Sequence, residues 1–319
     1  MLTEEISPVQ SNTDTGKERQ ESFSSQVKAE LCKDKISRTC CALAEAYGIL
    51  LFCNTFLNRE IKIVTSSAAV AQRLPRLFRR AFGVKFDQQP EELIPGAKFS
   101  FVITDRAKLD VILNAYGYSA QQLLSHHVNY AVLEESCCQA AFFRGAFLAG
   151  GSIIDPQKHF HLEFTTSHYY VAREIQPLMT ELGMEARTVV RNANYVNYFK
   201  RGEAVADFLT AIGAPVAAME VMNTILTKNL RNKVNRRYNC DVANVDKAIA
   251  AAQGQIAAIN RLRESGQLDS LPDNLKTTAE LRVENPELSL SQLAALAGIS
   301  KSCLNHRLRK LQELGASGG

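Results

Sequence analysis

The sequence FFRGAFLAGGSIID at residues 142–155 decides the fold of this chain. It predicts an apolar helix that runs into a double-glycine turn at Gly150 and Gly151. Gly145 and Ala146 remove side-chain bulk from this helix, so a second backbone can approach it closely. Large apolar side chains supply area for burial against that partner: Phe142, Phe143, Phe147 and Leu148. A second helix should therefore pack here.

The expected partner is an earlier copy of the same helix at residues 40–52. A constant offset of 97 positions relates the two copies, and it places Cys40-Cys41 on Cys137-Cys138, Ala44 on Ala141, Gly48 on Gly145 and Leu51 on Leu148. Rare residues that share one offset are better evidence for a repeat than shared hydrophobicity. The segment at 61–74 also resembles the segment at 161–175. We therefore expect a duplicated unit.

The copies predict the order helix, two strands, helix, two strands, helix, with one strand fewer before the second helix of the first copy, which is typical of an α+β domain with two antiparallel sheets. In the first copy we expect strands at 61–65, 84–86 and 99–103 and helices at 68–81 and 107–115. In the second we expect strands at 152–154, 161–165, 186–190 and 195–199 and helices at 169–182 and 203–212. The helix at 68–81 is basic, and we expect an exposed face that either contacts DNA or only increases solubility: Arg73, Arg76, Arg79 and Arg80.

The composition indicates a soluble protein of two or three domains. The chain has 319 residues, of which 46% are hydrophobic and 22% charged. Its apolar runs are shorter than the roughly 18–20 residues of a membrane span, and its polar N-terminus lacks the core of a signal peptide. We therefore expect a cytoplasmic protein, nucleoid-associated if it binds DNA, whose eight cysteines are reduced.

Paired cysteines come at the start of both copies of the small-residue helix, and four thiols near a pseudo-two-fold axis raise a zinc hypothesis. Adjacent cysteines are not the C-x₂-C spacing that wraps a tetrahedral ion. We expect instead buried thiols that pack at the helix starts, with no metal and no other cofactor.

Residues 289–311 predict two short helices joined by a glycine turn. Ser289 and Gln292 form a capping box at the start of the first helix, and Gly298 ends it because glycine tolerates a positive φ. Ser300 can cap the second helix. That helix has a stripe of leucines that should be buried: Leu304, Leu308 and Leu311.

The opposite face of the second helix is polar and basic: Lys301, Ser302, Asn305, His306, Arg309 and Lys310, with Arg307 at its edge. Two such helices match a helix-turn-helix, whose second helix enters the major groove. Arg and Asn read base edges, and Ser and Lys reach phosphates. We expect Asn305 and Arg309 to read bases and Lys301 and Lys310 to contact phosphates. The alternative is a helical hairpin with a solvated basic face.

A second basic cluster lies upstream: Lys228, Arg231, Lys233, Arg236 and Arg237. It could contact phosphates or form a solvated linker, and its interspersed asparagines slightly favour a specific role. The net charge of +4 is modest, so any nucleic-acid surface would have to be local.

Six stretches together resemble the WhiA family, transcription regulators of sporulation and cell division in Gram-positive bacteria. They are FSSQVKAEL (23–31), CCALAEAYGILL (40–51), RGAFLAGGSIIDP (144–156), HLEF (161–164), RNKVNRRYNCDVANVDK (231–247) and ISKSCLNHRLRKL (299–311). The duplicated unit resembles the LAGLIDADG homing-endonuclease fold. The resemblance implies a disordered tail (1–21), a two-repeat LAGLIDADG-like domain (22–213, with repeats at about 22–118 and 137–213), a helical basic linker (214–270) and a helix-turn-helix domain (271–314).

Catalysis is the rival interpretation of this resemblance. In the endonucleases an acidic residue at the end of each core helix binds the divalent metal for phosphodiester hydrolysis, and a two-metal site needs such carboxylates to converge. Here the matching positions are Cys53 and Gly150. Asp155 follows the second helix, but the first copy has only Asn54 or Asn58 nearby. We therefore expect a regulator of double-stranded DNA without catalytic residues.

Two alternatives stay open, a residual endonuclease and a module that binds protein or a small ligand. Expected protein partners of the regulator are another transcription regulator or RNA polymerase, and no membrane is expected to be involved.

Overall fold

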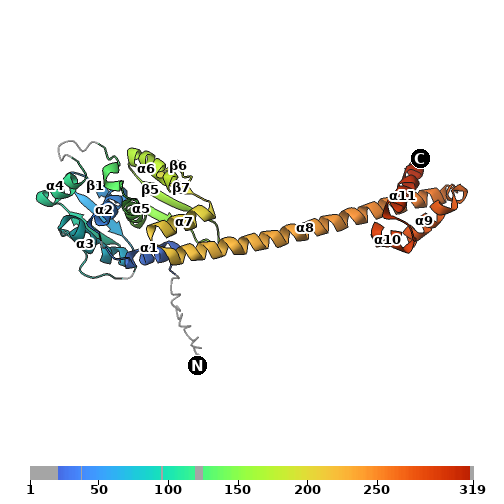
Figure 1. Ribbon diagram of the computed structural model, residues 1–319, viewed down its shortest axis with the longest axis horizontal. Coiled ribbons are helices and arrows are strands. Elements are labelled where there is room, and N and C mark those ends of the chain that lie inside the picture. Colours follow the sequence, from blue (N-terminus) through green and yellow to red (C-terminus); the bar gives the residue numbers. More distant parts are fainter. Residues whose placement is uncertain (1–20, 37, 95, 119–124, 317–319) are drawn as a thin grey trace, which may run out of the picture. The chain divides into compact units, whose positions relative to one another are not determined.

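The computed structural model describes residues 21–36, 38–94, 96–118 and 125–316 (Figure 1). The chain divides into two compact units, Met1–Thr227 and Lys228–Gly319. The expected N-terminal tail lies outside the described residues except for Glu21. In the part of the chain that the structure describes, no helix is both long and apolar enough to cross a membrane.

The first unit is built on two helices in direct backbone contact, α2 (Thr39–Phe52) and α5 (Ser136–Gly150). A Cβ atom added to Gly48 would lie 2.1 Å from the carbonyl oxygen of Phe142, and one added to Gly145 would lie 1.9 Å from that of Glu45. Both distances are shorter than any real contact of a Cβ atom. These two contacts are related by the 97-residue offset, so the structure confirms the duplicated helix and the seam between the copies.

The double glycine has a different role from the predicted turn. Gly150 is the last residue of α5, and Gly151 begins β4 (Gly151–Ile153) with an extended backbone, φ −85° and ψ 145°. Neither residue has a positive φ. Space is the reason for glycine here, because a Cβ atom on Gly150 would lie 2.6 Å from the carbonyl oxygen of Thr165, and one on Gly151 would lie 2.4 Å from the ring of Phe147.

Each repeat contributes one antiparallel sheet. The first sheet has the order β1 (Thr55–Phe56), β2 (Ile61–Thr65), β3 (Phe99–Ile103). The second has the order β4, β5 (Leu162–Thr166), β7 (Asn194–Phe199), β6 (Arg187–Arg191). Ile63 pairs with Phe101 in the first sheet and Phe164 with Asn197 in the second. Alternate residues of the central strands, such as Ile63 and Phe164, enter the core, as expected of sheets with one buried face.

The remaining helices of the first unit complete its core. They are α1 (Phe23–Lys33), α3 (Ala68–Phe82), α4 (Arg106–Ala115), the 3₁₀ helix η1 (Tyr130–Leu133), α6 (Tyr169–Glu181) and α7 (Gly202–Ile212). In the first repeat α3 contacts α2 and β2, and in the second α6 contacts β5 and β7. Leu74, Leu77 and Phe78 of α3 are fully buried, as predicted.

The strand predicted at 84–86 is absent. Phe86 is buried, and the chain meets the sheet just after it, where Gln88 forms an isolated antiparallel bridge with Val102. Pro90 follows two residues later and has no N–H to continue a ladder. The first repeat instead has the short strand β1, which the apolar pattern did not indicate.

Arg73 corrects the expectation of a fully exposed basic face on α3. Its side chain is 2% exposed and forms a bidentate ion pair with Glu45 of α2, with distances of 2.5 and 2.8 Å. At 100° per residue Arg73 lies only about 40° from buried Leu77. Arg144 of α5 approaches the same carboxylate at 3.5 Å, so the buried Glu45 is paired with cations from both repeats. Three arginines of α3 are exposed: Arg76, Arg79 and Arg80.

The expected connector and linker form one continuous helix, α8 (Pro215–Glu264), which extends from the first unit into the second. The second unit adds η2 (Leu268–Ser270), α9 (Asp273–Glu284), α10 (Leu290–Leu296) and α11 (Lys301–Ala316). Its core is a separate apolar cluster: Ile259, Leu262, Leu268, Ala279, Leu293, Ala294, Leu304, Leu308 and Leu311.

Candidate nucleic-acid interface

The start of α10 and its connection to α11 are set by local features that the sequence predicted. The Ser289 Oγ accepts from the backbone N–H of Gln292 at 3.4 Å, and the Ser289 N–H donates to the Gln292 side chain at 3.0 Å. Gly298 has a φ of 65°, which ends α10. The Cys303 N–H donates to the Ser300 Oγ at 3.2 Å and so caps α11. The predicted capping box, glycine turn and second cap are confirmed.

Helix α11 is held firmly against the rest of its unit. The predicted stripe of Leu304, Leu308 and Leu311 is fully buried. At the far end of the helix, the Arg261 guanidinium of α8 donates to the carbonyl oxygen of Gly315 at 3.0 Å. Burial of one face fixes the direction in which the opposite face points.

Six of the predicted contact residues of α11 are exposed: Lys301, Ser302, Asn305, His306, Arg309 and Lys310. At 100° per residue, Ser302, His306 and Arg309 lie opposite the leucine stripe. Asn305 and Lys310 lie on either side of them, and Lys301 occupies the first turn. Five of the six therefore share one surface, whereas Lys301 lies about 60° from Leu304 around the helix and about 180° from Lys310.

Arg307 and Arg309 have partners within the unit. Arg307 is half-buried, and its guanidinium donates to the carbonyl oxygen of Asn274 in α9 at 3.5 Å. Arg309 forms an ion pair with Glu313 at 3.3 Å, and both side chains are largely exposed. Exposed ion pairs are worth only about 0–1 kcal/mol, so a DNA phosphate or base can compete for Arg309. Of the predicted contact residues, Arg307 is therefore the one whose side chain is held against another helix of its own unit.

Arg282 of α9 is a structural residue that the sequence analysis missed. It is 2% exposed, and it donates to the side chain of Gln255 at 2.9 Å and to the carbonyl oxygen of Leu288 at 2.8 Å. These bonds connect α9 to α8 and to the segment that precedes α10. In the sequence, only the apolar neighbours Leu281 and Val283 hinted that Arg282 is buried, and such neighbours flank exposed arginines as well.

The upstream basic cluster lies on α8, where Arg231, Lys233, Arg236 and Arg237 are exposed and Lys228 is half-buried. The helical repeat puts Lys233, Arg236 and Arg237 on one side of α8, within about 100° of one another. Lys228 and Arg231 face roughly the opposite way. The five cations therefore do not form one continuous surface.

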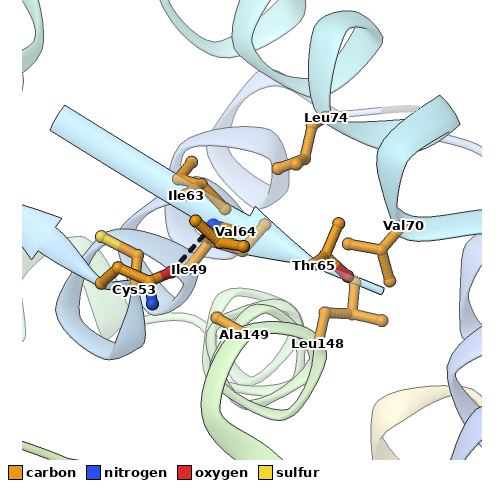
Figure 2. Close-up of a pocket in the computed structure, with 10 residues that line it drawn as sticks. Ile49, Cys53, Ile63, Val64, Thr65, Val70, Leu74, Leu148 and Ala149 are labelled. Carbon is orange, nitrogen blue, oxygen red and sulfur yellow. Dashed lines mark hydrogen bonds between the residues drawn. The ribbon is translucent and has the colours of Figure 1, made fainter. Parts of the chain in front are cut away.

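The other candidate site, which the expected resemblance to endonucleases would make a metal site, lies at the end of the seam between the repeats. A pocket of about 10 Å³ is found there, which is room for about one water molecule. Figure 2 shows its largely aliphatic lining, with Cys53 from the end of α2 and Leu148 and Ala149 from the end of α5; Asn54 and Thr65 are the polar residues that line it. No carboxylate is among the described residues that line it. The dashed line in Figure 2 is the hydrogen bond from the Val64 N–H to the Asn54 side chain, 2.8 Å long.

The side chains at this end of the seam are poorly suited to bind a hard divalent cation. Burial raises the pKa of the Cys53 thiol to about 12, and its single S–H can donate to the carbonyl oxygen of either Leu50 or Thr55, each 3.2 Å from the Sγ. Gly150 has no side chain. Asp155 is half-buried and accepts from the Gln157 N–H at 2.8 Å. Mg²⁺ prefers several oxygen ligands in octahedral geometry, which this set does not offer.

Comparisons with known proteins identify relatives of both units. The profile of the WhiA LAGLIDADG-like domain matches residues 139–231, and that of the WhiA C-terminal HTH domain matches residues 234–315. A "Probable cell division protein WhiA" from Ruminiclostridium cellulolyticum is 37% identical over 302 residues, which cover 92% of this chain and 96% of that protein. Another of the same name, from Alkaliphilus metalliredigens, is 34% identical over 307 residues, covering 92% and 97%.

A solved structure is similar over the same extent. Full-length WhiA from Thermatoga maritima matches with a TM-score of 0.56 and 22% identity, covering 94% of this chain and 99% of that one. At that identity the likeness bears on the fold alone. The matches confirm the predicted fold class, a LAGLIDADG-like α+β domain followed by a helix-turn-helix domain.

Proposed function

The chain belongs to the WhiA family, and from that premise we propose that it is a sequence-specific regulator of transcription that binds double-stranded DNA. The observation that supports this function best is the exposed polar and basic face of α11 on a capped, well-packed helix. Such a helix fits the major groove, where its first turns meet base edges. Relatives named as cell division proteins favour a role in cell division, chromosome organisation or sporulation.

We assign roles by side-chain chemistry. Asn305 and Arg309 read adenine and guanine edges, because an amide and a guanidinium each make paired hydrogen bonds there. Lys301 and Lys310 contact phosphates on opposite sides of α11, and Ser302 and His306 lie between them around the helix. Secondary phosphate contacts come from α8 through Lys233, Arg236 and Arg237 on one side and Lys228 and Arg231 on the other.

In this proposal residues 271–314 bind DNA, residues 214–270 link the domains, and residues 22–213 form a scaffold without nuclease activity. The largely aliphatic pocket beside Cys53, without carboxylates in its described lining, supports the last point. The protein would act in the cytoplasm at the nucleoid, where another transcription regulator or RNA polymerase is the expected partner.

The proposal is tested with the full chain and genomic DNA fragments, titrated with salt in the presence of Mg²⁺. A Lys301→Ala/Arg309→Ala variant should bind its selected sites at least about tenfold more weakly, since one good base contact is worth about 1–3 kcal/mol. The slope of log K against log[salt] should fall by about 1 for the lost phosphate contact. A Lys247→Ala/Arg263→Ala variant removes the same charge from exposed positions on α8 and should retain specific binding.

Two results would contradict the proposal. Undiminished specific binding by the Lys301→Ala/Arg309→Ala variant would place the reader outside α11. Cleavage of the DNA by the purified chain would show that the scaffold retains nuclease activity and would favour the endonuclease alternative.

A further inference from the structure

Four cysteines from the two repeats converge at the start of the seam. Cys40 and Cys41 lie in the first turn of α2, and Cys137 and Cys138 lie in the first turn of α5. Their four Sγ atoms all lie within 4.8 Å of one another. The sequence-based expectation of buried thiols is wrong for three of them, because Cys138 is buried, Cys41 and Cys137 are half-buried, and Cys40 is exposed.

The adjacent spacing of the cysteines in the sequence no longer argues against a metal once the structure is known. The C-x₂-C rule applies where one short segment supplies two ligands by wrapping the ion. Here neither helix has to do so, because backbone contact at Gly48 and Gly145 brings the two helix starts side by side. The 97-residue repeat then places two adjacent thiols from each helix at the same level of the seam.

The distances suit a single tetrahedral ion. A zinc–sulfur bond of about 2.3 Å in a tetrahedron requires sulfur atoms about 3.8 Å apart. Cys40 and Cys41 have Sγ atoms 4.0 Å apart, so they need almost no movement. An iron–sulfur cluster would insert its own iron and sulfide atoms between the cysteines and hold them farther apart.

We propose that Cys40, Cys41, Cys137 and Cys138 form a structural site for one Zn²⁺ ion, which ties the two repeats together at the start of the α2–α5 seam. Four sulfur ligands in tetrahedral geometry select a soft ion such as Zn²⁺ over Mg²⁺ or Ca²⁺. Four thiolates leave no open coordination position, so the site is structural and does not supply catalysis.

Positive charge lies beside the cluster, although burial raises the pKa of the Cys41 thiol to about 11 and that of the Cys138 thiol to about 12. Both helices begin at the cluster, and the partial positive charge of a helix N-terminus stabilises thiolates in the first turn. The Arg38 guanidinium donates to the Sγ of Cys137 at 3.7 Å, and hydrogen bonds of this kind orient metal ligands. A zinc ion with four thiolates carries a net charge of about −2, and Arg38 and the two helix ends partly offset it.

The first test measures metal in the full chain as purified under reducing conditions without a chelator. We expect about one zinc per chain by mass spectrometry. The metal-free protein, titrated with Co²⁺, should bind one equivalent and develop the intense thiolate charge-transfer band and visible bands of a tetrahedral sulfur site. A Cys40→Ser/Cys138→Ser variant, which removes one ligand from each helix, should lose this spectrum. Cys240→Ser/Cys303→Ser, which changes two cysteines outside the cluster, should keep it.

The titration of the unmodified chain keeps the test decisive even if the ligand variant folds poorly. The proposal is overturned if the folded, reduced chain contains no zinc and gives no tetrahedral cobalt spectrum. It is also overturned if the four thiols are found as disulfides, which the loss of two hydrogens per bond would reveal in the intact mass. Unchanged cobalt binding by Cys40→Ser/Cys138→Ser would likewise exclude these ligands.

Discussion

The backbone contact between α2 and α5 can be tested by adding one methyl group at its centre. In a Gly145→Ala variant the new Cβ atom would lie 1.9 Å from the carbonyl oxygen of Glu45, whereas ordinary contact begins at 3.4 Å. The two helices would have to separate by the difference, about 1.5 Å. Both colliding groups belong to the backbone, so no side-chain rotation can relieve the contact.

The cost follows from what the separation disrupts. Overpacking a well-packed core costs about 1–3 kcal/mol, and pulling two helices apart also weakens many dispersion contacts along the seam. Alanine is about 1 kcal/mol more favourable than glycine inside a helix, which offsets part of the loss. We expect a net destabilisation of about 3 kcal/mol, or a fall in Tm of about 6–12 °C for a domain of this size.

Urea unfolding monitored by tyrosine signals measures this effect in the first unit. The chain has no tryptophan, and the stacked rings of Tyr47 and Tyr116, with centroids 4.3 Å apart, lie in that unit. Gly254→Ala on α8 is the matched control, because its Cβ atom would lie 3.6 Å from the side-chain nitrogen of Gln312, which is ordinary contact. It should be neutral or stabilising by up to about 1 kcal/mol. If Gly145→Ala unfolds at the same urea concentration as the parent chain, the seam is not in backbone contact and the reasoning fails.

Two further predictions concern buried charge. Glu45→Ala leaves Arg73 buried without its carboxylate and should destabilise the first unit by about 3–5 kcal/mol in urea unfolding. Arg76→Ala, on the exposed face of the helix that carries Arg73, should change stability by less than about 0.5 kcal/mol. Equal effects of the two variants would contradict the burial of the ion pair. Burial lowers the pKa of His126 from its ordinary 6.5 to about 4, so below pH 6.5 the unfolded chain takes up a proton that the folded protein does not. Stability should fall by about 1.4 kcal/mol per pH unit between these values, and His126→Leu should flatten the dependence, measured by unfolding at pH 7 and pH 5.

The helix-turn-helix was predicted in detail because its signals are local. A capping box, a glycine with positive φ and a leucine stripe each depend on residues within about one or two helical turns. Ser289 therefore caps α10, Gly298 has a positive φ and Leu308 is buried, as predicted. The repeat was equally visible, since the constant offset that relates Gly48 to Gly145 needs no structure to be found.

The tertiary structure decided which side chains meet across long separations in the chain. Arg73 looked like an exposed cation on a basic helix, and only the position of Glu45 in another helix made its burial possible. Charge and local pattern cannot reveal such a partner, because the free energy of burying an ion depends on the groups around it in space.

The sequence by itself determined most of the elements, the duplication and the polar face of α11, because these follow from the periodicity of neighbouring residues; the strand expected at 84–86 and the unexpected β1 are the exceptions. The meeting of Cys40 and Cys41 with Cys137 and Cys138 required the two repeats to be packed together. The distance between their sulfur atoms is set by how closely the helices approach at the two glycines. The distance between the two helices depends on how the whole core packs, so it cannot be read from any single segment of the sequence.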